Sequence, residues 1–268
     1  MGAFDEQALS EKALSEKAPD DSPPLRLDIR GVSKRFGSLL AVDDLHLAIP
    51  PGCIHAFLGP NGAGKTTTIR MCTGLLRPDS GSILIDGLDI EHEGVAARRR
   101  IAYVPDEPYL YERLTGREFL SFTGRIYGLD NDTYQQRLAE VSQRFHLHGF
   151  LDALAEGYSH GMRQRVVLAA ALLHQPRLLI VDEPLVGLDP KHIRVVLDVL
   201  REIAAAGGSV LMSTHTLAVV EELAHSVTLI DHGRQRFHGS VAELTDQGRL
   251  EDVFLRMTLD HDEGAETP

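Results

Sequence analysis

The stretch Gly59-Pro60-Asn61-Gly62-Ala63-Gly64-Lys65-Thr66-Thr67 follows the pattern of a glycine, four residues, then a glycine, a lysine and a hydroxyl residue. Residues 53–58 before it are a mostly apolar run, and apolar residues recur at helical spacing over 65–76 after it. A strand, a glycine-rich loop and a helix in this order are the setting that a phosphate-binding loop requires. The stretch therefore predicts a nucleoside triphosphate site within an α/β fold.

Each part of this loop has a physical role. Its glycines let consecutive backbone N–H groups turn inward around a phosphate, and the N-terminus of the following helix adds its positive end. Lys65 is expected to reach the β- and γ-phosphates, and the hydroxyl of Thr66 is a candidate ligand of Mg²⁺.

A second segment supplies the carboxylates that such a site needs. Residues 178–183 read Leu-Leu-Ile-Val-Asp-Glu, an apolar strand pattern that ends in two acids. Because side chains alternate along a strand, we expect Asp182 and Glu183 to face different ways. Asp182 is predicted to hold Mg²⁺ through water, and Glu183 to polarise an attacking water. An acid pair at a strand end is more often a solvated rim, but the phosphate loop in the same chain favours the catalytic interpretation.

Strand and helix patterns alternate around these two segments. Apolar and polar residues alternate from Leu25 and again from Leu45, which predicts an N-terminal antiparallel β element. Further strands are predicted at 83–85, 101–104, 178–181, 210–213 and 227–230, with helices over 193–206 and 216–224. This alternation is typical of a mainly parallel sheet covered on both faces, and with the phosphate loop it predicts a P-loop NTPase core of the RecA-like type.

The chain divides into one large domain and two tails. Residues 108–175 read as helices with no strand candidate, so we expect an α-helical lobe over 106–175 between two core segments. The predicted units are a disordered tail over 1–24, an ATPase domain over 25–259 and an acidic disordered tail over 260–268. Besides the helical lobe, the ATPase domain has its core at 25–105 and 176–240 and a C-terminal helical segment at 241–259.

Composition excludes several classes of protein. The 268 residues hold 27 Lys plus Arg against 39 Asp plus Glu, a formal charge of −12, which weighs against general nucleic-acid binding. No apolar run approaches the roughly 20 residues that cross a bilayer as a helix, and the acidic N-terminus is not a secretory signal. We therefore expect a cytoplasmic protein. Cys53 and Cys72 lie in apolar stretches and are predicted to pack in the core.

Two further segments make the chain similar to the ATP-binding cassette (ABC) ATPase family from residue 25 to residue 239. Residues 158–162, Tyr-Ser-His-Gly-Met, stand where the family has its signature, usually leucine, serine, glycine, glycine, glutamine. Residues 186–189, Val-Gly-Leu-Asp, stand where the family has the loop after its catalytic glutamate. The family's motifs thus follow one another in the expected order.

The resemblance implies a role for each matching residue. Phe36 corresponds to the aromatic residue that stacks on adenine, and His215 to the histidine that contacts the γ-phosphate and orients the water that Glu183 activates. Ser159 and Gly161 belong to a helix N-terminus that attracts the γ-phosphate of ATP held by a second subunit. Two ABC ATPase subunits, identical in the simplest case, are therefore expected to enclose two ATP molecules with Mg²⁺.

Three segments depart from the family pattern. Asp106 and Glu107 stand where the family has a glutamine; an aspartate can still approach Mg²⁺ but cannot donate a hydrogen bond as an amide does. His160 and Met162 replace a glycine and the glutamine of the signature, and Val186 replaces a serine. These variants resemble the bacterial exporter branch of the family, so we interpret them as subfamily traits.

The predicted function is that of the ATP-hydrolysing subunit of a multi-subunit exporter at the cytoplasmic face of the membrane. A separate transmembrane permease is expected to seat a short helix near residues 106–114, with Tyr109, Leu110 and Tyr111 as candidate contacts. No nucleic-acid partner is expected. One alternative is a single-cassette ATPase that serves a soluble complex. Another is a binding module that responds to ATP without hydrolysing it, which the intact Glu183 argues against.

Overall fold

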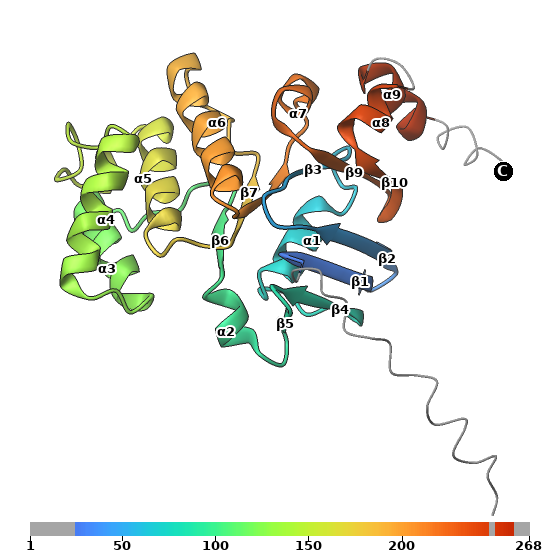
Figure 1. Cartoon of the computed structure of the whole chain (residues 1–268), viewed down its shortest axis with the longest axis horizontal. Coiled ribbons are helices and arrows are strands. Elements are labelled where there is room, and N and C mark those ends of the chain that lie inside the picture. Colours follow the sequence, from blue (N-terminus) through green and yellow to red (C-terminus); the bar gives the residue numbers. More distant parts are fainter. Residues whose placement is uncertain (1–24, 247–249, 260–268) are drawn as a thin grey trace, which may run out of the picture.

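The computed structural model describes residues 25–246 and 250–259, with side chains described as far as residue 254. The tails predicted over 1–24 and 260–268, and residues 247–249 of the predicted C-terminal segment, lie outside the described residues. Figure 1 shows an elongated molecule in which a lobe of helices stands at one end, and the sheets with further helices around them form the rest. Among the described residues, no helix is both long enough and apolar enough to cross a membrane.

A six-stranded sheet carries the site, in the order β10-β9-β3-β8-β7-β6. All neighbouring strands are parallel except β10, which runs antiparallel to β9 at the edge. The strands are β3 Ile54–Leu58, β6 Ile101–Val104, β7 Leu178–Asp182, β8 Ser209–Ser213, β9 Ser226–Asp231 and β10 Arg234–Ser240. Every residue of β3, β7 and β8 is buried, as is usual for parallel strands covered on both faces. The predicted mainly parallel core is confirmed.

A four-stranded antiparallel sheet in the order β2-β1-β4-β5 packs beside it. Its strands are β1 Leu27–Phe36, β2 Leu39–Ile49, β4 Ser80–Ile85 and β5 Leu88–Asp89. The prediction that placed the strand at 83–85 in the parallel series was wrong, because β4 pairs antiparallel with β1. Gly81 allows this pairing: its φ is +83°, and a Cβ there would overlap the Gly31 carbonyl oxygen.

Helices cover both faces of the parallel sheet. Buried residues of α5 and α6 pack on one face, and α1 together with the antiparallel sheet packs on the other. Cys53 and Cys72 lie in the second of these cores, as predicted. The helices outside the lobe are α1 Lys65–Cys72, α2 Gly94–Arg98, α6 Pro190–Ala205, α7 Leu217–Leu223, α8 Val241–Thr245 and α9 Leu250–Leu259.

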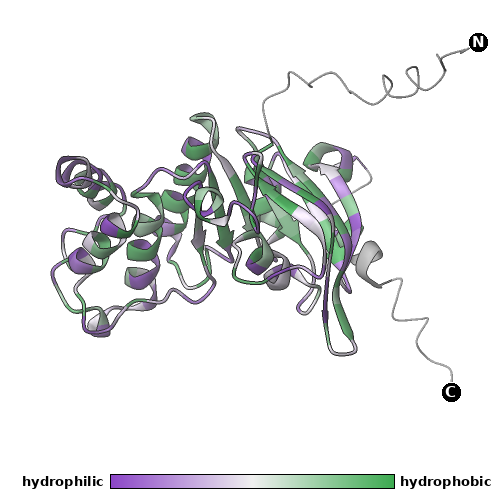
Figure 2. Cartoon of the chain, turned by 90° about the horizontal axis from the view of Figure 1, so that it is seen from below, coloured by the Kyte–Doolittle hydropathy of each residue, from purple (hydrophilic) through white to green (hydrophobic). Residues whose placement is uncertain are grey.

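The helical lobe consists of α3 Gly116–Ile126, α4 Asn131–Arg144, the short 3₁₀ helix η1 Ala155–Gly157 and α5 His160–Leu172. Figure 1 shows α3, α4 and α5 grouped at the end of the molecule away from β1 and β2. The prediction of helix over 108–115 was wrong: these residues form a loop, and α3 begins only at a capping box made by Thr115 and Glu118. In Figure 2, apolar residues follow the strands, whereas hydrophilic residues are frequent on the helices of the lobe.

Candidate functional site: a nucleotide-binding cleft

The sheet topology brings the two predicted segments together. The phosphate loop follows the carboxyl end of β3, and the acid pair follows the carboxyl end of β7. Strand β8 lies between β3 and β7, parallel to both, so the carboxyl ends of all three strands reach the same edge of the sheet. Ligands bind at this edge in open α/β sheets.

Glycine is required at two positions of the phosphate loop. A Cβ at Gly59 would overlap the carbonyl oxygen of Ile230, so the loop can lie against β9 only without a side chain there. Gly64 has φ +107°, and a Cβ would stand 2.5 Å from the carbonyl oxygen of Ala41. At Gly62 a Cβ would meet open space, but its φ of +81° favours glycine. These glycines set the path of the backbone from β3 into the start of α1.

Lys65 lies folded over the loop from the first position of α1. Its Nζ donates to the carbonyl oxygens of Gly59 at 2.6 Å and Pro60 at 3.1 Å. Burial lowers the pKa of the Lys65 amine, while the charges of Glu183 and Asp182 raise it. The ammonium group therefore has both acids within its electrostatic reach.

Asp182 is the last residue of β7 and is buried. Its carboxylate accepts a hydrogen bond from the hydroxyl of Ser213, its register partner on β8. The hydroxyl of Thr66 lies on the exposed side of α1 in its first turn. A hydroxyl and a carboxylate are oxygen ligands of the kind that Mg²⁺ prefers. The donors available here suit that ion.

Glu183 leaves the direction of the strand. Strand β7 ends at Asp182, and Glu183 adopts φ +48° while its N–H donates to the Ser213 carbonyl at 3.1 Å. Strand alternation was therefore the wrong reason for the two acids to diverge; the left-handed backbone at Glu183 separates them. The side chain is 16% exposed, and its Oε1 lies 2.9 Å from Nδ1 of His215. His215 follows β8 and is exposed.

Phe36 lies at the end of β1 and is 48% exposed, so it is not a core residue. The ammonium of Lys34 stands 5.8 Å from the centre of its ring. An exposed ring beside a cation is available for stacking on a planar base.

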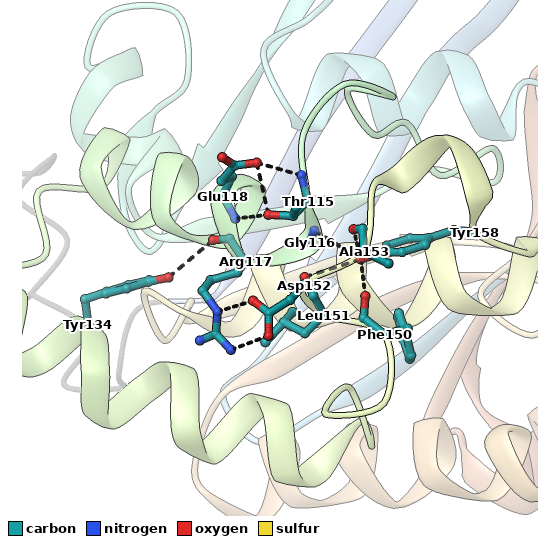
Figure 3. A network of polar contacts seen from close by, with 10 residues as sticks. All are labelled: Thr115, Gly116, Arg117, Glu118, Tyr134, Phe150, Leu151, Asp152, Ala153 and Tyr158. Carbon is teal, nitrogen blue, oxygen red and sulfur yellow. Dashed lines mark hydrogen bonds and ion pairs between the residues drawn. The ribbon is translucent and has the colours of Figure 1, made fainter.

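The signature segment is anchored inside the lobe through Tyr158 (Figure 3). The hydroxyl of Tyr158 accepts from the Gly116 N–H at 3.1 Å and donates toward the Phe150 carbonyl at 2.8 Å. Burial raises the pKa of this phenol. Ser159 then caps α5 by accepting from the Met162 N–H at 3.3 Å. The N-terminus of α5, with Gly161 in its first turn, is therefore held in place and partly open to solvent.

Asp106 lies in the loop after β6 and is exposed. Burial raises the pKa of Tyr103 to about 12, and the charges of Asp182 and Asp106 add to the effect. Both acids are thus near the Tyr103 phenol. Asp106 also lines a pocket with His160 of the lobe and Val186.

The structure gathers Lys65, Asp182, Glu183 and His215 at one edge of the sheet, while Phe36 stands on the neighbouring antiparallel sheet and Ser159 on the lobe. Sequence reasoning missed three residues that support them. They are Ser213, which holds Asp182, Tyr158, which anchors the signature, and Gln164, whose amide donates to the Pro184 carbonyl at 3.3 Å. Ser213 directly follows the apolar run 210–212, which was the available signal, whereas Tyr158 and Gln164 stand among polar residues and glycine and carried none.

Comparison with known proteins points to one family. A family model described as ABC transporter matches residues 42–186, more than half of the chain. The daunorubicin/doxorubicin resistance ATP-binding protein DrrA of Streptomyces peucetius is 40% identical over 240 residues, which are 90% of this chain and 72% of that protein.

Two more relatives extend the agreement. The Nod factor export ATP-binding protein I of Cupriavidus metallidurans is 37% identical over 82% of this chain and 73% of its own length. A solved structure of an ATP-binding subunit of an ABC transporter superimposes with a TM-score of 0.82 at 33% identity, covering 86% of this chain and 98% of that one. The phosphate loop, the acid pair and these matches together show that the chain belongs to the ABC transporter ATP-binding family.

Proposed function

We propose that this chain binds and hydrolyses ATP as the ATPase subunit of an export-type transporter, closing as a dimer around two ATP molecules and driving a separate membrane permease. The observation that carries the proposal is the contact between Glu183 and His215 beside the phosphate loop, with 2.9 Å between Oε1 and Nδ1. It joins a base to its orienting partner at the place where a γ-phosphate would lie.

Different residues of the site bind the phosphates, activate the attacking water and hold the metal ion. Backbone N–H groups of the phosphate loop and the ammonium of Lys65 bind the phosphates. Glu183 takes a proton from the attacking water, and His215 holds that water and the γ-phosphate in line. Thr66 and Asp182, with Asp106 beside them, would hold Mg²⁺, which supplies charge neutralisation at the phosphates. Phe36 would stack on the adenine.

The position of the signature supports the proposed dimer. Ser159 and Gly161 are on the lobe and partly open to solvent, whereas Lys65 is on the core of the same chain. A second copy would bring its signature helix N-terminus to the γ-phosphate bound by the first. Each nucleotide then becomes part of the interface.

A patch of aromatic residues supports the permease contact. Tyr109 is 70% exposed and Tyr111 is 47% exposed, with their ring centres 5.5 Å apart, and Phe122 stands 6.1 Å from Tyr111. Leu110 was wrongly included among these contacts, because it is 2% exposed and belongs to the core. Exposed aromatic residues grouped in this way are typical of protein interfaces. The name of one relative includes Nod factor export and that of another includes drug resistance, which supports export as the direction of transport.

The test compares purified wild type with Glu183→Gln. Wild type should release phosphate from ATP with Mg²⁺, and the variant should lose roughly 10²-fold or more of that rate while binding ATP with unchanged affinity. Light scattering should show the variant as a dimer in ATP and a monomer without nucleotide. Hydrolysis that persists in Glu183→Gln would contradict the catalytic assignment, and a monomer in saturating ATP would contradict the dimer.

A further inference from the structure

The residues that depart from the family pattern converge in space. A pocket of about 520 Å³ between the lobe and the loop after β7 is lined by Asp106, Glu107, Pro108, His160, Arg163 and Val186. Asp106, His160 and Val186 replace the residues that the family usually has, and Glu107 adjoins the first of them. These residues come from three separate places in the chain. Among these changes, the one from glycine to His160 adds the largest side chain to the pocket.

His160 contacts the loop that follows the acid pair. Its Nε2 lies 3.2 Å from the carbonyl oxygen of Val186. Because a carbonyl oxygen only accepts, Nε2 carries the proton in this contact. The ring also packs on Gly187: a Cβ there would stand 2.5 Å from Cδ2 of His160. The imidazole therefore points at its own chain's loop rather than outward from the N-terminus of α5.

That loop includes the turn that presents Glu183. The Val186 N–H donates to the Glu183 carbonyl at 3.3 Å, which closes a turn over residues 183–186. Glu183 stands at its start with φ +48°, an unusual conformation for a residue with a side chain, so the surroundings must hold it. At the other end, the carbonyl of Val186 is the acceptor that His160 engages.

A second side chain of the same helix contacts the same turn. Gln164 is buried, and its amide donates to the Pro184 carbonyl at 3.3 Å. Gln164 and His160 lie four residues apart on α5, so they project from the same face of the helix. Side chains of the signature helix α5 therefore donate hydrogen bonds to two of the four carbonyl groups of the turn at 183–186.

We propose that His160 is a positioning residue for hydrolysis: it donates from Nε2 to the Val186 carbonyl and so fixes the turn that holds Glu183 against His215. This inference rests on the proposed ATPase function and adds a device by which the signature helix sets the geometry of the base on its own chain. The donor, rather than the bulk of the ring, does this work. Loss of the donor lets the turn shift, and small misplacements of a catalytic base cost large factors in rate.

The experiment uses the full chain with four substitutions. His160→Leu keeps bulk and removes the donor, and His160→Gly also removes the donor and restores the usual family residue. His160→Gln places an amide N–H near the position of Nε2. His148→Leu, at an exposed histidine of the same lobe, is the matched control. For each we would measure kcat and KM for ATP, the ATP dissociation constant and the unfolding temperature.

The proposal expects kcat to fall at least about tenfold in His160→Leu and His160→Gly, with an unchanged ATP dissociation constant, and to stay within about threefold of wild type in His160→Gln and His148→Leu. Wild-type kcat in His160→Leu or His160→Gly would overturn it. Equal losses of kcat in all three His160 variants would assign the effect to the ring and would also overturn the proposal. Weakened ATP binding in these variants would assign the effect to a nucleotide contact, which would overturn it as well. Glu183→Gln measured in parallel separates the two claims, because its full activity would contradict the ATPase proposal itself.

Discussion

His215 approaches Glu183 through Nδ1, which lies 2.9 Å from the carboxylate Oε1. Because an ionised carboxylate has no proton to donate, the contact assigns the Nδ1 proton to His215 and leaves Nε2 as the free end of the ring. The turn at 183–186 and the end of β8 hold the two side chains in this relation. We therefore expect the pair to act as one unit.

A unit of this kind predicts non-additive losses. His215→Ala and Glu183→Gln should each lower kcat by roughly 10²-fold or more, and the double variant should lose little beyond the more damaging single change, because either change already breaks the pair. Phosphate release at saturating ATP measures this. Losses that multiply in the double variant would show that the two residues act independently.

Asp106 provides a test of the metal site. If it helps Thr66 and Asp182 to hold Mg²⁺, Asp106→Ala should raise the Mg²⁺ concentration for half-maximal hydrolysis by about tenfold, a typical cost of removing a supporting group. Glu107→Ala, at the adjacent exposed acid, is the matched control. An unchanged requirement for Mg²⁺ in Asp106→Ala would remove this residue from the metal site.

The anchor of the signature predicts an effect on stability. Tyr158→Phe deletes a buried hydroxyl and leaves the Gly116 N–H without its acceptor, so the free energy of unfolding should fall by about 1–3 kcal/mol. Tyr134→Phe is the control, because its hydroxyl lies 3.5 Å from the Arg117 carbonyl at the edge of the lobe and should matter little (Figure 3). Chemical unfolding measures both. Equal stability of the two variants would contradict the anchoring role.

Asp86 predicts how stability depends on pH. Its side chain is 1% exposed and pairs with Arg26, Arg100 and Arg177, the last at 3.2 Å. Burial raises the pKa of this carboxyl, but the hydrogen bonds from Arg100 and Arg26 outweigh it, so the pKa lies below its usual value. The contribution of the Asp86 carboxylate to the free energy of unfolding is therefore complete above its pKa in the unfolded chain, about 3.9. It is lost as the pH falls through the pKa of this group in the folded protein.

Asp86→Asn should accordingly lower the free energy of unfolding at pH 7 by about 3 kcal/mol, because it removes the buried carboxylate that Arg26, Arg100 and Arg177 all contact. The difference from wild type should shrink as the pH drops below about 4. Asp152→Asn, at a 69% exposed partner of Arg117, should cost much less than Asp86→Asn, because solvent screens this ion pair. A gap between Asp86→Asn and wild type that stays constant down to pH 3 would refute the assignment.

Much of this architecture could be predicted from the sequence, because the decisive segments are local. The loop at 59–67 and the acids at 182–183 carry their chemistry in consecutive residues, and apolar periodicity marks the strands that flank them. The pairing partner of β4 could not be predicted in this way, since a strand pattern does not say which neighbour it joins. The apolar residues of the loop at 108–115 suggest a helix, but they pack into a core contributed by distant segments, as Leu110 does.

The supporting contacts were out of reach for the same reason. Ser213 on β8 donates a hydrogen bond to Asp182 on the neighbouring strand β7. His160 contacts the carbonyl of Val186, which lies 26 positions further along the sequence. Such pairs depend on the tertiary arrangement, which no local pattern encodes. The left-handed backbone of Glu183 was equally hidden, because it is imposed by the turn and not by the residue type.

The most direct measurement of the central claim is to recover tagged Glu183→Gln protein from solubilised membranes in ATP and Mg²⁺ and to identify what accompanies it. A polytopic membrane protein should co-purify, and it should be lost when Tyr109→Ala and Tyr111→Ala are added but not when Val95→Ala, an exposed apolar residue of α2, is added instead. Recovery of ribosomes or soluble assembly factors with no membrane protein would contradict the transporter account and assign this ATPase to a soluble complex.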